Sequence, residues 1–329
     1  MPHLPRLALL LLVVGLASCA VHRQSVQTSE WTYVETATEP VARHEAAFVS
    51  VGDRYYLLGG RGIRPVSIYD KSTSEWTEGA PPPVEIHHFQ PVVYRGEVYL
   101  LGAMTGGYPG ETPLPHVYIY NPDRDEWRRG HEIPEDRRRG GAGAVEHDGR
   151  IYLICGIRDG HRGDHKTWLD VYDPTTGDWE RLPDAPRPRD HFQAAVVDGK
   201  IYAAAGRTTV AATNPFANTI GAVDVYDTET RRWITLPNEL PTRRAGTAAI
   251  AVDKRVVVIG GESDTQEPAH AEVEALDVAS GDWTALPPLV RGRHGTGAIH
   301  HDGSLIMASG CGMRGGEPEL ADMIRARVE

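Results

Sequence analysis

Six tryptophans recur at nearly constant intervals, and this period constrains the fold more than any other feature of the sequence. Steps of 45 to 54 residues separate Trp31, Trp76, Trp127, Trp179, Trp233 and Trp283. A fixed period of this length indicates a repeat architecture, in which each repeat is a small unit that buries its apolar face against its neighbours. The chain of 329 residues is therefore expected to divide into successive units of one kind.

A second feature accompanies the tryptophans. Five of the tryptophans lie six residues after an Asp or Asn. That Asp or Asn is the last residue of a short apolar run, and the five runs span residues 66–70, 117–121, 169–173, 223–227 and 273–277. Alternating runs rich in β-branched residues and tyrosine predict strands, and the Pro, Thr and Gly that follow predict turns. The tryptophan then begins the next strand and anchors it by burying its ring.

A third spacing defines two further strands in each repeat. A small residue ends an aliphatic run at Gly60, Ala103, Gly156, Gly206, Gly261 and Gly310. Sixteen residues earlier, a run of small residues begins after His44, His87, Gly140, Asp190, Ala245 and His294. Each repeat is therefore predicted to contain four strands.

The glycine, Tyr-Asp and tryptophan positions together resemble a kelch-repeat β-propeller of the bacterial exported or lipoprotein type, with a galactose oxidase-like propeller. The resemblance covers residues 30–329, and Gly59-Gly60 and Gly260-Gly261 keep the full glycine pair. Single glycine positions are replaced by Ala103, Cys155, Ala205 and Ser309. The resemblance implies an all-β, six-bladed propeller in a single domain, with short edges only. The strand at Trp31 is expected to complete the last blade and close the ring.

The first residues are predicted to be a targeting segment. The apolar run 7–16 is too short to span a bilayer as a helix but is typical of a signal peptide. It ends in Leu16-Ala17-Ser18-Cys19, which resembles a bacterial lipobox and implies that Cys19 carries lipid. We expect a signal peptide at 1–18, a lipidated cysteine and tether at 19–29, and the propeller at 30–329. The alternative is an ordinary secretory signal cleaved near Ala20.

The same resemblance predicts where the chain resides. Ala20 follows the cysteine, and by similarity to Gram-negative lipoproteins this favours the outer membrane, with the protein facing the periplasm. Several acyl chains would give stable anchoring to that membrane. We expect a cell-envelope protein that is a monomer.

Composition excludes other classes of protein. A formal net charge of −11 argues against a nucleic-acid partner, because phosphate contacts need a basic surface. Three cysteines cannot form a disulfide framework. Cys155 and Cys311 are expected to be buried thiols in opposite blades.

Arginine and histidine are nevertheless concentrated at one predicted face. The residues before the first strands are Arg43, His44, His87, His88, Arg139, Arg189, His191, Arg244, Arg293 and His294. The loops after the aliphatic strands add Arg61, Arg64, Arg158, Arg207 and Arg314. Arginine binds carboxylates bidentately, and the resemblance implies that the repeat arginines line a ligand site. The alternative is that an arginine recurring once per repeat bonds carbonyl groups of the repeat itself.

No catalytic motif emerges from the sequence, and no cofactor is expected. His161, Asp164 and His165 are residue types that bind metals, but no second cluster completes a set, so we expect a solvated loop. His44-Glu45 lacks the second histidine of a zincin motif.

We therefore expect a binding or scaffold module that presents a basic channel mouth to an acidic peptide, an acidic protein or an anionic glycan. The alternative is an enzyme similar to the exported sialic-acid mutarotases, which need one acid and one base. In such an enzyme His44 or His294 would be the acid or the base, beside an arginine that binds the carboxylate of the sugar. That resemblance is incomplete, because the mutarotases carry long insertions between repeats. A copper enzyme similar to galactose oxidase would need a Tyr/His/Cys copper site and additional domains, and this sequence supplies neither.

Overall fold

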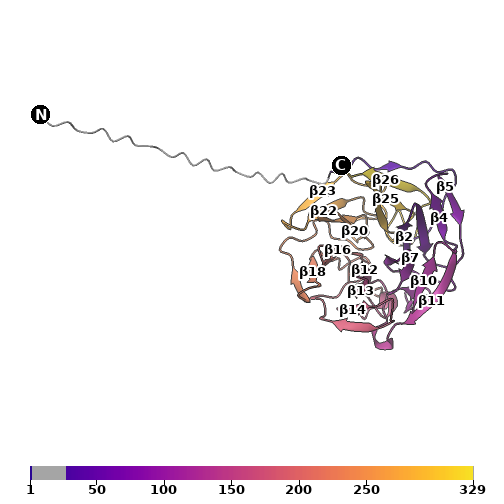
Figure 1. The fold of residues 1–329 in the computed structure, drawn as a ribbon, viewed down its shortest axis with the longest axis horizontal. Helices are drawn as coiled ribbons and strands as arrows, with labels where there is room; N and C mark the ends of the chain where they lie inside the picture. The colour runs from indigo at the N-terminus through magenta and orange to yellow at the C-terminus, as the bar shows by residue number, and fades with distance from the viewer. Residues whose placement is uncertain (2–26, 329) are drawn as a thin grey trace.

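A computed structural model of the chain describes residue 1 and residues 27–328. Within these residues the strands form six four-stranded antiparallel sheets, which stand as blades around a central axis (Figure 1). The prediction of an all-β, six-bladed propeller is confirmed. The described helices are two single 3-10 turns, η1 (Glu135–Arg137) and η2 (Gly160–Arg162), and no described helix is long and apolar enough to cross a membrane.

The first three blades follow one another along the chain. Blade 1 contains β2 (Ala46–Val51), β3 (Arg54–Gly59), β4 (Ser67–Asp70) and β5 (Glu75–Glu78). Blade 2 contains β6 (Pro91–Tyr94), β7 (Glu97–Leu100), β10 (His116–Asn121) and β11 (Glu126–Glu132). Between its second and third strands lies a hairpin of β8 (Met104–Thr105) and β9 (Thr112–Pro113). Blade 3 contains β12 (Gly143–His147), β13 (Arg150–Ile154), β14 (Leu169–Tyr172) and β15 (Trp179–Leu182).

The remaining blades repeat this order, and the last one combines both ends of the described chain. Blade 4 contains β16 (Ala194–Val197), β17 (Lys200–Ala203), β18 (Asp224–Asp227) and β19 (Arg232–Thr235). Blade 5 contains β20 (Ala248–Val252), β21 (Arg255–Ile259), β22 (Val273–Asp277) and β23 (Trp283–Leu286). Blade 6 contains β24 (Ala298–His301), β25 (Ser304–Ala308), β26 (Met323–Arg327) and β1 (Thr32–Tyr33).

The Tyr-Asp and tryptophan positions of each repeat pack against each other. In blade 1 Tyr69 lies opposite Trp76 in the strand register, and their ring centroids are 5.2 Å apart. The Asp70 carboxylate accepts a hydrogen bond from the amide of Ser72 at 2.8 Å, which stabilises the turn between the two strands. Asn121, Asp173, Asp227 and Asp277 accept equivalent bonds in later blades. The repeated residues thus form a strand-turn-strand unit.

The apolar core consists of six clusters, and each fills the seam between two neighbouring blades. The alternation of β3 shows how this arises: Tyr56 and Leu58 pack toward blade 2, whereas Tyr55 and Leu57 pack toward blade 6. Successive side chains of a strand point to opposite faces, so every inner strand contributes to two seams. The blades hold one another in place through these shared cores.

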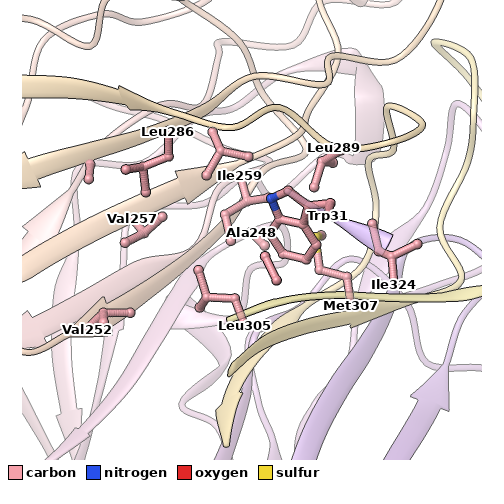
Figure 2. Packing of buried hydrophobic residues seen from close by; sticks show 13 residues of the cluster. Trp31, Ala248, Val252, Val257, Ile259, Leu286, Leu289, Leu305, Met307 and Ile324 are labelled. Carbon is pink, nitrogen blue, oxygen red and sulfur yellow. The ribbon is translucent and has the colours of Figure 1, made fainter. Parts of the chain in front are cut away.

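Blade 6 joins the two ends of the propeller. The strand β1 pairs with β26 through Thr32–Arg325 and Tyr33–Ile324. Trp31, just before β1, is only 4% exposed and packs in the seam between blades 5 and 6. Figure 2 shows its ring among Ile259, Leu289, Leu305, Met307 and Ile324.

Candidate functional site

A closed ring of backbone hydrogen bonds surrounds the axis at one end of the channel. Each blade contributes one residue to this ring, located one to three residues before its first strand. We call these six residues the axial ring. Its members are Glu45, His88, Gly141, His191, Gly246 and Gly295. Each amide from His88 to Gly295 donates to the carbonyl of the preceding member, at 2.6 to 3.2 Å, and the Ala46 amide closes the ring on Gly295 at 3.0 Å.

All six members of the axial ring have a positive φ, between 53° and 65°. Glycine adopts this conformation without strain, but other residues are strained by about 1–2 kcal/mol. Glycine occurs in three blades, whereas Glu45, His88 and His191 occupy the other three positions. Other described residues share a positive φ, but here three polar side chains occur at such positions in one ring, which makes the axial ring the candidate site.

The loops between the second and third strands of the blades enclose a cavity of about 510 Å³ above the axial ring. Each blade contributes to its lining, so the cavity lies at the predicted channel mouth. The lining includes Arg61 from blade 1, Tyr108 from blade 2, His161 from blade 3, Arg207 and Phe216 from blade 4, Glu262 from blade 5, and His294 and Gly315 from blade 6. Glu45 and His88 line the same cavity.

Three histidines converge next to this cavity, and two of them, His88 and His161, line it. His88, His161 and His191 are 3%, 5% and 5% exposed, and one nitrogen of each lies within 4.8 Å of the other two. The Nε2 atoms of His161 and His191 are 3.1 Å apart. Their rings meet edge to face with centroids 4.8 to 5.1 Å apart.

Carboxylates lie behind two of these rings. Glu111 Oε1 is 2.9 Å from His161 Nδ1 and 2.7 Å from an Arg61 nitrogen. Asp190 Oδ1 is 2.5 Å from His191 Nδ1, and the Asp190 carboxylate also accepts the amide of Thr209 at 3.0 Å. Burial alone would raise the pKa of Asp190, but its bond to His191 and the nearby arginine lower that pKa to about 2. Both carboxylates are therefore ionised acceptors.

A second buried pair lies on the other side of the cavity. His294 Nε2 is 3.4 Å from Glu262 Oε2, and Glu262 Oε1 accepts a 2.7 Å hydrogen bond from Arg207. Burial disfavours the charged imidazole, but Glu262 outweighs this and raises the pKa of His294 to about 9. Burial would likewise raise the pKa of Glu262, but His294 and Arg207 lower it to about 2. The pair thus carries one positive and one negative charge at neutral pH.

The repeat arginines do not reach this cavity, which corrects the expectation that they line a ligand site. All five are 0% exposed: Arg43, Arg139, Arg189, Arg244 and Arg293. Each guanidinium bonds carbonyl groups of its own blade; Arg139, for example, donates to Cys155 O at 2.6 Å and to Leu153 O at 2.9 Å. Four of them also pair with the carboxylates of Asp170, Asp224, Glu274 and Asp322. The alternative, that an arginine recurring once per repeat bonds carbonyl groups of the repeat itself, therefore describes these five residues.

The other predicted residues divide between the cavity and its surroundings. His44, Arg61, Arg207 and His294 line the cavity. His87 is fully buried beneath it, with Nδ1 2.6 Å from His88 Nδ1. Arg314 lies over the ring of Phe216, a residue of the cavity lining, at 5.5 Å, whereas Arg158 lies over the Trp168 ring at 5.8 Å, outside that lining.

The three weak metal candidates separate in the structure. His161 reaches the histidine cluster, whereas Asp164 is about half exposed and pairs with Lys166. His165 donates to Thr209 O at 2.8 Å and lies 3.2 Å from Asp190, so it supports a carboxylate. Cys155 and Cys311 are buried free thiols, as expected. Cys19 lies outside the described residues.

Sequence reasoning missed Glu45, Glu111 and Asp190 as members of the site. One signal was available for Glu45: it occupies a repeat position that holds glycine in three other blades. Glu111 lies in the hairpin specific to blade 2, where the repeat gives no guide. Its position beside His161 arises only when the loops of blades 2 and 3 fold over the axis.

Comparisons with known proteins agree with this architecture. The model of the KLHDC2/KLHL20/DRC7 Kelch-repeats domain matches residues 15–206 and 92–310 in two overlapping alignments. Kelch-like protein terF of Aspergillus terreus is 29% identical over 288 residues, covering 82% of this chain and 61% of that protein. Kelch-like protein 25 of Xenopus tropicalis is 24% identical over 264 residues, covering 77% of this chain and 42% of that protein. The chain thus spans about half the length of these relatives.

A solved structure adds to this comparison. The structure of YjhT is similar with a TM-score of 0.74 at 16% sequence identity, covering 89% of this chain and 99% of that chain. At this identity the likeness concerns the fold alone.

Proposed function

Because the chain belongs to the KLHDC2/KLHL20/DRC7 family of Kelch-repeat domains, we propose that it is a binding module whose ligand enters the cavity above the axial ring. The observation that carries this proposal is the cavity of about 510 Å³, to which loops of all six blades contribute. A concave site of this size with a few convergent polar groups is typical of a small-ligand pocket.

We propose further that the ligand carries an acidic group, as an acidic peptide or an acidic sugar does. Three positive groups support this: Arg61 and Arg207 line the cavity, and so does His294, which is cationic at neutral pH. Arg207 and His294 share one carboxylate, Glu262, and Arg61 pairs with Glu111. Arg61 is the most accessible of them, with 25% of its side chain exposed. This assignment replaces the repeat arginines, which are buried, with arginines of the loops.

A thermal-shift titration of the purified full chain tests this proposal, with sialic acids, uronates and acidic peptides as probes. A ligand that binds only the folded state raises the melting temperature, and the rise grows with the logarithm of the ligand concentration once this exceeds the Kd. We expect stabilisation by at least one acidic probe, and its loss in Arg61→Ala. Arg158→Ala, a loop arginine outside the cavity lining, is the matched control. If none of these acidic probes gives a shift at saturating concentration, the acidic-ligand proposal is wrong.

A second candidate function is an isomerase of acidic sugars, of the sialic-acid mutarotase type. It is favoured by carboxylate–histidine pairs within the cavity: Glu45 Oε2 is 3.4 Å from His88 Nε2, and Glu262 Oε2 is 3.4 Å from His294 Nε2. Ring opening needs a base to take the anomeric hydroxyl proton and an acid to protonate the ring oxygen as its bond to the anomeric carbon breaks. Such pairs can supply both groups.

Exchange spectroscopy distinguishes the binder from the isomerase. NMR of a sialic acid at equilibrium measures the rate at which its two anomers interchange. An isomerase accelerates the exchange, and Glu262→Gln abolishes the acceleration. Stabilisation by the sugar without faster exchange would identify the chain as a binder.

We also propose that Cys19 anchors the chain to the envelope membrane through lipid. The support is the lipobox-like run at 16–19, with the propeller beginning at residue 28. Labelling with a fatty-acid analogue tests this. The wild type should incorporate label and sediment with outer membranes, whereas Cys19→Ser should do neither. Equal labelling of both chains would refute the anchor.

A further inference from the structure

We infer that the Nε2 atoms of His88, His161 and His191 bind one divalent transition-metal ion on the propeller axis. The three rings come from different blades and converge on one point; His88 and His161 line the cavity, and His191 lies beside them in the axial ring. All three are almost fully buried. Imidazole nitrogens are ligands for zinc and for neighbouring transition metals, so the class of the ion follows from the donor set. The inference stands apart from the acidic ligand proposed above.

The contact between His161 and His191 brings two ring nitrogens to a distance that a cation between the rings would explain. Each Nδ1 atom lies near a carboxylate oxygen: His191 Nδ1 is hydrogen-bonded to Asp190 at 2.5 Å, whereas His161 Nδ1 is 2.9 Å from Glu111 without the alignment of a hydrogen bond. A carboxylate accepts hydrogen bonds, so we assign the ring protons to the Nδ1 atoms. Both Nε2 atoms then present lone pairs to each other across 3.1 Å. Two lone pairs at this distance repel unless a metal ion or a shared proton lies between them.

A metal ion fits this separation. A zinc ion lies about 2.0–2.1 Å from each imidazole nitrogen, and tetrahedral coordination then places two nitrogens roughly 3.3 Å apart. The observed 3.1 Å between His161 and His191 is close to that value, and the three nitrogens lie within 4.8 Å of one another, so the His88 ring must move closer when it binds the same ion. The carboxylates of Glu111 and Asp190 stand where metal proteins commonly place the groups that orient ligating histidines.

The positions of the ring protons on His87 and His88 leave the third lone pair on His88 Nε2. His87 Nε2 is 3.0 Å from the carbonyl oxygen of Gly106, which only accepts, so the His87 proton is on Nε2. His87 Nδ1 is then an acceptor, and His88 Nδ1, 2.6 Å away, is the donor. His88 Nε2 is left as a bare lone pair, and it is a buried atom with no hydrogen-bond partner. An unpaired buried nitrogen is costly unless a ligand satisfies it.

Glu45 is placed to complete the coordination. Its Oε2 atom lies 3.4 Å from His88 Nε2, and the residue lines the cavity. Three histidines with a carboxylate or a water at the fourth position form a site that is open toward the cavity. Glu45, His88 and His191 are also the three non-glycine members of the axial ring. The strain at these positions is explained if the three side chains serve one ion.

Metal titration of the purified full chain tests the inference after removal of bound ions with a chelator and dialysis. We expect one equivalent of Zn²⁺ to bind, and one equivalent of Co²⁺ to give the visible spectrum of tetrahedral coordination. His161→Ala and His191→Ala should each weaken Zn²⁺ binding by more than 100-fold. His300→Ala, an exposed histidine on β24, is the matched control and should bind as the wild type does.

A measurement on the wild type covers the case in which a variant fails to fold. Nitrogen-15 NMR of the histidine rings should show three Nε2 resonances shifting together as Zn²⁺ is added. The inference is overturned if the folded wild type binds no Zn²⁺ and one ring is an imidazolium, because a shared proton then joins His161 and His191. It is equally overturned if binding is unchanged in both variants. Neither result depends on an acidic ligand.

Discussion

His161 and His191 approach each other to 3.1 Å through their Nε2 atoms, while a carboxylate oxygen lies 2.9 Å from Nδ1 of the first ring and 2.5 Å from Nδ1 of the second. The first histidine lies in a loop of blade 3 and the second in the axial ring of blade 4. Folding thus brings two oriented lone pairs together from separate repeats. The following predictions test the site and the fold that produces it.

Glu111 is expected to affect metal binding without touching the ion. Glu111→Gln weakens the orientation of His161, and loss of such a supporting carboxylate typically reduces metal affinity 10–100-fold. Competition with a chromophoric chelator measures the affinity. Glu317→Gln, an exposed carboxylate lining the same cavity, should leave affinity unchanged. Equal effects of both substitutions would show that only the overall charge of the cavity matters.

Arg139 is expected to be required for stability and not for ligand contact. Arg139→Ala removes one of the two arginine partners of the buried Asp170 carboxylate, which keeps Arg137, and leaves the Cys155 and Leu153 carbonyls without their donor. Breaking a buried ion pair together with its hydrogen bonds costs about 3–5 kcal/mol. Urea unfolding measures the loss. Arg158→Ala in the same blade is partly exposed and should change stability by less than about 0.5 kcal/mol. A stable Arg139→Ala chain that no longer binds ligand would restore the repeat arginine to the binding site.

Trp31 is expected to hold the closing blade in place. Trp31→Ala removes a ring that is 4% exposed, and such truncations cost about 3–5 kcal/mol. Tyr33→Ala, two residues away and 52% exposed, is the matched aromatic control and should be nearly neutral. Thermal denaturation compares the two. Similar melting temperatures for both variants would mean that the seam between blades 5 and 6 closes without the ring.

The axial ring requires glycine where no site residue is present. Gly246 has a φ of +64°, and a Cβ there would meet His294 at 3.4 Å, an ordinary contact. Gly246→Ala should therefore cost about 1–2 kcal/mol, mainly from backbone strain. Gly107→Ala, with no heavy atom within 4 Å of the added Cβ, should cost little. Urea unfolding that gave both variants wild-type stability would show that the ring tolerates strain more easily than we expect.

The His294–Glu262 pair is expected to make stability depend on pH. The pKa of His294 is raised to about 9, against about 6.5 in an unfolded chain. Its contribution is fully present below pH 6.5 and is lost as the pH rises through 9. Glu262 is the main charged group facing His294, and Glu45 and the Cys311 thiol also face it.

The difference in unfolding free energy between wild type and His294→Gln isolates this effect, measured with a chelator present. We expect the difference to decrease by an amount on the order of 3 kcal/mol between pH 6.5 and 9. A difference independent of pH would mean that His294 is neutral in the folded chain.

The sequence by itself determined the blade and the number of blades. The Tyr69–Trp76 pair and the Asp70 turn are local: their partners lie within ten residues, so spacing along the chain specifies them. The same spacing placed Arg43 and His44 beside the first strand of blade 1. It also identified His161 as a residue able to bind metal.

Only the tertiary structure decided what these side chains face. Arg139 and Gly141 are two residues apart, yet the arginine turns into its blade and the glycine joins the axial ring. The residues of the axial ring have a positive φ, which changes the direction of the backbone there. The position of a residue in the repeat therefore does not reveal where its side chain points. His88, His161 and His191 meet because the closed ring brings segments 30 to 103 residues apart to one axis. That closure depends on packing across all six seams, which no local pattern encodes.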